Sequence, residues 1–278
     1  MPATTPLYLL LTAIAGGLVA SLALVPARQT SRGFARTLAL VAVGAWVPAL
    51  AYDAWFRLGP RPRPGLAGGA GMLAVACQGA ALGLALLYLR RLGRERLPGR
   101  GLMGLAAGCS GIGLGIAPVL ILGATARGIL VMLGALQGLV SAAVLGAGLS
   151  AMLLGHFYLV VPGLSLDPLR RLTRLFAAAV LLHLLLDGVV LSLVGPGAVL
   201  PRSGGMDPVL GLLVGLVPLL MRVLFGLVGA LLLAIMALQT VAMRSTRSAT
   251  GILYAAVVFV LIGEFAAGHL LVSLGLPL

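Results

Sequence analysis

The chain lacks lysine and asparagine altogether, and it carries few charges of either sign. Only 9% of its 278 residues are charged, including six acids, and it has three histidines and two cysteines. Soluble domains average about 25% charged residues and 45–50% apolar residues, whereas this chain is 61% hydrophobic. The scarcity of charge excludes a water-soluble protein and indicates that lipid surrounds most of the chain.

The absence of lysine leaves arginine as the only basic residue, with 19 copies and a formal net charge of +13. Because these arginines lie in short segments between apolar runs, we expect them to set membrane topology and meet lipid headgroups. The sequence thus predicts membrane lipids as partners and no nucleic acid. Cys77 and Cys109 lie inside apolar runs without a CxxC partner, so we expect two small buried hydrophobes.

Eight apolar runs approach or exceed the roughly 20 residues that a helix needs to cross a bilayer. No strand alternation of the barrel type is present. We therefore predict an all-α fold, a polytopic membrane helical bundle of about eight transmembrane helices, forming a single integral membrane domain over residues 1–278. The runs cover residues 7–25, 37–56, 66–89, 102–123, 129–154, 175–194, 209–243 and 251–274.

The seventh run is too long for one straight crossing. From Pro208 to Met243 it would form about 54 Å of helix at about 1.5 Å per residue, against a hydrocarbon core of about 30 Å. Either Pro218 kinks this helix, or residues 208–220 lie along the outer interface. A separate crossing at 209–220 would be too short, and it would reverse the topology of the C-terminal end.

The arginines are distributed unequally between the two sides. The segments after runs one, three, five and seven hold thirteen arginines, and those after runs two, four and six hold five. Positively charged segments stay on the cytoplasmic side. The sequence therefore predicts an N-out/C-out topology in a bacterial inner (plasma) membrane.

Helix starts and packing faces are also predicted. Asp167-Pro168 and Asp207-Pro208 each place an N-cap acid before a proline at the first helical position. Small residues at helical spacing let backbones approach closely in lipid. We expect such faces at Gly104 with Gly108 and Gly111 with Gly115, at Gly134, Gly138, Ala142 and Gly146, and at Gly211, Gly215, Gly226 and Gly229.

Ionisable side chains inside lipid are costly, so they are candidates for function. Five occur, all in the last three runs: His183, Asp187, Arg222, Glu264 and His269; the first five runs are expected to hold none at membrane depth. His183 and Asp187 are four residues apart on one helix face, and Glu264 lies at a depth similar to Asp187. We predict that Asp187, Arg222, Glu264 and His183 form one proton- or quinone-handling site in the outer half of the bundle. An interhelical polar clasp without chemistry is the alternative.

The histidine depths argue against haem b. By rise per residue, His183 lies about 13 Å and His269 about 27 Å from the cytoplasmic end of their runs, and His156 lies at or beyond the end of its run. A metal site from His183, Asp187 and Glu264 would rest on a single i, i+4 pair, so no metal is predicted. A quinone is the one cofactor left open. No catalytic nucleophile motif is present, and whether the chain is an enzyme stays open.

A second candidate site precedes the last run. Arg244, Arg247, Ser248 and Thr250 combine two charges and two hydroxyls at a helix N-terminus, an arrangement that favours an anion. Binding of a lipid phosphate together with helix capping by Ser248 or Thr250 accounts for this pattern, and a specific ligand phosphate is the alternative.

In helix number and expected lack of haem, the chain resembles the haem-free, eight-helix quinol-handling subunits of respiratory complexes, such as the polysulfide reductase membrane subunit. The resemblance is one of architecture, and it carries no residue across. It implies a membrane-embedded subunit of a respiratory or redox complex, with other protein subunits as partners. The alternatives are a proton-coupled small-molecule transporter, a structural or assembly membrane protein without its own chemistry, and an intramembrane enzyme acting on lipid.

Overall fold

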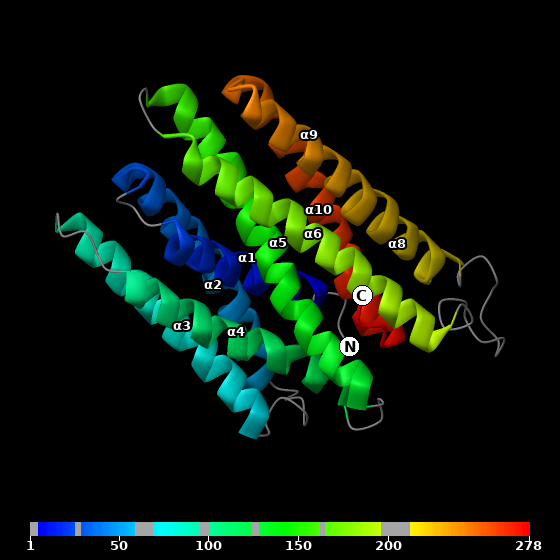
Figure 1. The fold of residues 1–278 in the computed structure, drawn as a ribbon. Helices are drawn as coiled ribbons and strands as arrows, with labels where there is room; N and C mark the ends of the chain where they lie inside the picture. Colours follow the sequence, from blue (N-terminus) through cyan, green and yellow to red (C-terminus); the bar gives the residue numbers. More distant parts are fainter. Residues whose placement is uncertain are drawn as a thin grey trace.

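The computed structural model describes residues 5–25, 29–58, 69–94, 100–123, 128–161, 165–195 and 212–278. In these residues all elements are helical, and eight helices are long and apolar enough to cross a membrane. The chain is therefore an all-α, multi-pass membrane protein, as the apolar runs predict. The helices lie alongside one another as elongated rods (Figure 1).

The first six crossings each consist of one helix. They are α1 (Thr5–Leu24), α2 (Arg32–Leu58), α3 (Gly69–Gly93), α4 (Arg100–Leu122), α5 (Gly128–Val160) and α6 (Asp167–Val194). The seventh crossing, Leu212–Ala242, contains α8 (Leu216–Leu220), the π-helical segment η3 (Met221–Gly229) and α9 (Ala230–Ala242), and the eighth is α10 (Thr246–Leu274). Helices such as α5 and α6 extend beyond their predicted runs because helical hydrogen bonding continues where hydropathy falls.

Helix α1 occupies the interior of the bundle, where it contacts α2, α4, α5 and α10. Helices α3 and α4 form one flank, and α8 and α9 form the opposite flank (Figure 1). Gly17 of α1 meets Gly146 of α5 backbone to backbone, so this contact leaves no room for a side chain on either residue. Of the predicted small-residue face of the fifth run, Ala142 and Gly146 therefore lie against α1, whereas Gly134 and Gly138 lie against Pro118 and Leu114 of α4.

One predicted packing face is wrong. A Cβ added to Gly104 or Gly108 would meet nothing within 4 Å, and both residues are exposed. The face of α4 that packs instead carries Gly113, against Gln78 of α3. A GxxxG spacing identifies two residues on one face, but the rotation of the helix against its neighbours decides whether that face is covered.

The seventh crossing continues through Pro218. Helices α8 and α9 follow one another along a single rod (Figure 1), so residues 212–220 belong to the crossing helix rather than to a segment along the interface. Pro218 lies in the first turn of α8, where a backbone N–H has no partner within the helix and proline is tolerated. The predicted start at Asp207-Pro208 lies outside the described residues.

The predicted caps of two other helices are wrong. Leu166 is the N-cap of α6, so Asp167 is already helical, and its N–H donates to the hydroxyl of Ser165. Ser245 is the N-cap of α10 and makes no side-chain capping bond, so Ser248 and Thr250 lie inside the helix. Helix α6 begins at the predicted cap residue Asp167, and α10 begins before Ser248 and Thr250, so none of the three occupies the N-cap position.

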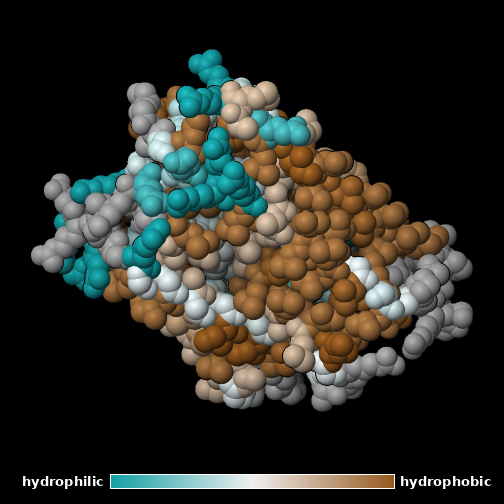
Figure 2. Space-filling view, in the orientation of Figure 1, coloured by the Kyte–Doolittle hydropathy of each residue, from teal (hydrophilic) through white to brown (hydrophobic). Residues whose placement is uncertain are grey.

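Charge separates the two ends of the bundle. Figure 2 shows hydrophilic residues gathered at one end of the molecule and a broad hydrophobic surface beside it. Six arginines, at positions 28, 61, 63, 96, 127 and 202, lie outside the described residues. Exposed arginines at the ends where α2, α4, α6 and α10 begin are Arg32, Arg36, Arg90, Arg91, Arg94, Arg100, Arg171, Arg174, Arg244 and Arg247. The assignment of this end to the cytoplasm stays a prediction.

Candidate functional site

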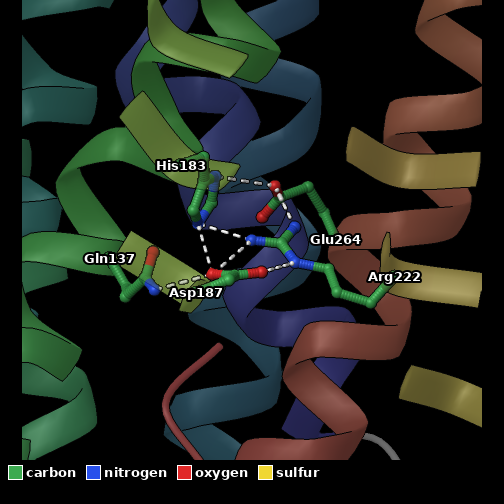
Figure 3. Close-up of polar contacts among 5 residues, drawn as sticks. All are labelled: Gln137, His183, Asp187, Arg222 and Glu264. Atoms are coloured by element: carbon green, nitrogen blue, oxygen red, sulfur yellow. Dashed lines mark hydrogen bonds and ion pairs between the residues drawn. The ribbon is translucent and has the colours of Figure 1, made fainter. Parts of the chain in front are cut away.

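One arginine and two acids meet in the interior of the bundle. Arg222 of η3 is fully buried, and its Nε donates to Asp187 Oδ2 at 2.8 Å while Nη1 donates to Glu264 Oε1 at 2.7 Å. Its Nη2 lies 3.4 Å from Asp187 Oδ1. The predicted juxtaposition of these three residues is confirmed, and Figure 3 shows the guanidinium between the two carboxylates.

His183 completes the charge cluster, by which we mean His183, Asp187, Arg222 and Glu264. Its Nε2 lies 2.5 Å from Arg222 Nη2. A guanidinium can only donate, so Nε2 must accept, which makes the imidazole neutral with its proton on Nδ1. That Nδ1 lies 3.3 Å from Glu264 Oε1 but is not aligned for a hydrogen bond. With a neutral His183 and both acids ionised, the cluster carries a formal charge of −1.

Two neutral residues of α5 join the cluster. Gln137 Nε2 donates to Asp187 Oδ1 at 2.7 Å, while its buried Oε1 has no partner. Ser141, one turn further along, lines the same crevice as Glu264. A search for ionisable groups overlooks both residues, although an amide inside lipid also needs a partner. The intramembrane amide was the signal that could have found Gln137.

The helix geometry explains how these side chains converge. His183 and Asp187 project from one face of α6, as their spacing predicts. Gly226 of η3 and Gly263 of α10 press backbone against backbone, which brings the helix carrying Arg222 close to Glu264. Because η3 is π-helical, its side chains follow a wider register than in an α-helix; such segments are frequent at functional sites.

A small crevice reaches the cluster from one side. It has a volume of about 60 Å³, and its lining includes Gln137, Ser141 and Glu264 at the cluster and Pro118, Leu271 and Leu278 away from it. These last residues belong to the end of the bundle opposite the exposed arginines, which the topology prediction places outside. At about 30 Å³ per water, the crevice has room for about two waters. Of the charge cluster, only Glu264 lines it.

The other predicted residues lie apart from the cluster. His269 is half-buried further along α10, and His156 is exposed near the end of α5. Asp53 is buried near the end of α2, which finishes at Leu58. In the described parts of the chain, no three His, Cys, Asp or Glu side chains are placed to hold a metal ion.

The residues of the second predicted site, which precedes the last run, do not all lie on the surface. Arg244, Arg247 and Ser248 are exposed. Thr250 is buried against Gly155 of α5, and its hydroxyl donates to the Thr246 carbonyl at 2.7 Å. The structure therefore keeps the two arginines and Ser248 on one surface but removes Thr250 from it, because the helix turns its side chain toward α5.

Comparison with protein-family models, with curated proteins and with solved structures finds no match for this chain. The residues of the charge cluster, with their burial and the crevice that reaches Glu264, are therefore the features that point to a function.

Proposed function

We propose that this chain is a proton-handling membrane protein in which Glu264 exchanges a proton with the side of the membrane on which the crevice opens. The observation that carries the proposal is that the crevice reaches the cluster at Glu264. A net negative charge is costly inside lipid, and one proton bound by the cluster removes it. Glu264 is 7% exposed and Asp187 1% exposed, so water meets Glu264 first.

The size of the crevice favours a proton over a quinone at this position. Pockets that hold small organic ligands measure about 300–1,000 Å³, and the crevice measures about 60 Å³. Water can enter such a space and deliver protons, whereas a quinone ring needs a larger one. A charge cluster that served only to hold helices together would need neither a net negative charge nor a crevice that reaches it.

The proposed setting is a membrane subunit of a respiratory or redox complex in the bacterial inner membrane. The eight-helix architecture favours a subunit that works with other proteins. The exposed arginines at one end of the bundle offer them a positively charged surface. Membrane lipids are the other partners.

A proton-coupled transporter is the second candidate, and the π-helical segment favours it. Transporters place their coupling residues where a membrane helix departs from regular α-helical geometry, and Arg222 lies in such a segment. Purification in mild detergent separates the two settings. A redox subunit should copurify with proteins that hold redox centres, whereas a transporter should purify without them.

The proton-handling proposal is tested by infrared difference spectroscopy of the purified protein in lipid between about pH 4 and about pH 9, a range that spans the ordinary carboxyl values. We expect the carbonyl stretch of a protonated, buried carboxylic acid to change with pH and to be lost in Glu264→Gln. Asp167→Asn, which removes an exposed acid, should leave that band in place. A band that persists in Glu264→Gln, or that never forms, overturns the proposal.

A further inference from the structure

A groove between α2 and α3 lies at the arginine-rich end of the bundle, at the opposite end from the crevice. It has a volume of about 600 Å³ and is lined by Arg32, Gly33, Arg36 and Leu40 of α2 and by Leu89, Leu92 and Gly93 of α3. This volume is within the range of small-molecule sites. The groove therefore has room for a ligand that the crevice cannot hold.

The two walls of the groove differ in chemistry along its length. Arg32 and Arg36 are one helical turn apart and exposed, and Leu40 lies one turn deeper on the same face. On the other wall, Leu89 and Leu92 are apolar. A ligand that matches this pattern carries a negative charge at one end and an apolar chain at the other.

The position and shape of the groove identify the source of that ligand. Arginines just inside the cytoplasmic end of a membrane helix attract anionic lipid headgroups. Among the described residues, nothing lies within 4 Å of a Cβ placed on Gly93, so this part of the structure leaves the groove open where a headgroup would enter. A free phosphate would use the arginines but leave the apolar walls uncovered.

We propose that the groove between α2 and α3 binds one anionic phospholipid of the cytoplasmic leaflet, with its phosphate at Arg32 and Arg36 and an acyl chain against Leu40 and Leu89. This site is separate from the segment before α10, and it does not depend on proton handling by the charge cluster.

Native mass spectrometry of the full chain in mild detergent tests the proposal, with dioleoyl phosphatidylglycerol and dioleoyl phosphatidylcholine as probes. We expect the wild type to bind phosphatidylglycerol more tightly than phosphatidylcholine. The double variant R32Q/R36Q should bind phosphatidylglycerol roughly 30-fold more weakly, because each arginine near the surface contributes roughly a factor of five to six in affinity and the two factors multiply. The control R171Q/R174Q removes the same charge from exposed positions of α6 and should bind as the wild type does.

A second pair of variants tests whether the lipid occupies the groove, without changing the charge of its arginines. Gly93→Trp fills the groove while leaving both arginines in the sequence, and it should weaken phosphatidylglycerol binding. Gly101→Trp, at another open and exposed glycine, should not. Equal binding of the two lipids, unchanged binding in R32Q/R36Q or Gly93→Trp, or displacement of the lipid by inorganic phosphate alone would overturn the proposal.

Discussion

Replacing Arg222 by methionine removes the positive charge from the centre of the cluster and keeps an unbranched apolar side chain in its place. The variant leaves two carboxylates without their charged partner. Each of them accepts a short hydrogen bond from the guanidinium in the wild type, at 2.8 Å and 2.7 Å. His183 Nε2 also loses its donor. Asp187 and His183 are at most 1% exposed, and neither lines the crevice that reaches Glu264, so water cannot replace the guanidinium at these two residues.

The expected loss of stability is large. Breaking a buried ion pair by removing one partner costs about 3–5 kcal/mol, because an uncompensated charge is left in the interior. Hydrogen bonds to charged groups contribute about 1.5–3 kcal/mol each, and two of them give a similar range. We therefore expect Arg222→Met to lower the free energy of unfolding by about 3–5 kcal/mol, a sizeable part of the 5–15 kcal/mol typical of a folded protein.

The assay is reversible unfolding of the purified protein in mixed micelles, with Arg171→Met as the matched control on the exposed surface of α6. The control should stay within about 0.5 kcal/mol of the wild type. The sharper test adds Glu264→Gln. In the wild-type background this change removes a negative charge that pairs with Arg222 and should destabilise the protein, whereas in the Arg222→Met background it removes an unpaired buried charge and should stabilise it.

That reversal of sign is the result on which the reasoning depends. If Glu264→Gln lowers stability equally in both backgrounds, the two residues are not energetically coupled. If Arg222→Met costs less than about 1 kcal/mol, the buried charges are compensated by something other than the guanidinium. Either result would refute the account of the cluster as an interdependent unit.

Three further predictions concern the scaffold. Gly146→Leu should prevent α1 from packing on α5 and abolish monodisperse protein in size-exclusion chromatography, whereas Gly104→Leu, on an uncovered face, should leave the elution profile unchanged. Gln78→Leu removes the acceptor of the buried Trp46 indole N–H and should cost about 1–3 kcal/mol, seen as a lower unfolding midpoint. Reporter fusions in the segment after α3 and at the C-terminus should report opposite sides of the membrane, and reports from the same side would contradict the predicted topology.

Much of the architecture follows from the sequence because its signals are local. An apolar run of about 20 residues can only be satisfied in lipid by a helix, since no water is present to accept or donate backbone hydrogen bonds. The eight crossings and the all-α fold were therefore predictable. The sequence also identified the charged side chains that most need partners. The free-energy cost of a charge depends on its depth in the membrane, and that depth can be counted from the rise per residue along a helix.

The meeting of Arg222 with Asp187 and Glu264 was predictable for the same reason. Few ionisable groups share that depth, and only one of them is a permanent cation. Counting residues along the helices could not show that the Arg222 side chain contacts both carboxylates. That contact depends on the close approach of Gly226 to Gly263 and on the π-helical register of η3.

Tertiary structure alone decided which faces of the helices are covered. Gly104 and Gly146 look alike in the sequence, yet one faces open space and the other lies against Gly17. Gln137 and Thr250 are both polar residues within apolar runs, and the rotation of their helices turns the first toward Asp187 and the second toward Gly155. Hydropathy depends on the neighbours of a residue along the chain, whereas its partners depend on how each helix is rotated against the others, and that rotation is settled only when the whole bundle packs.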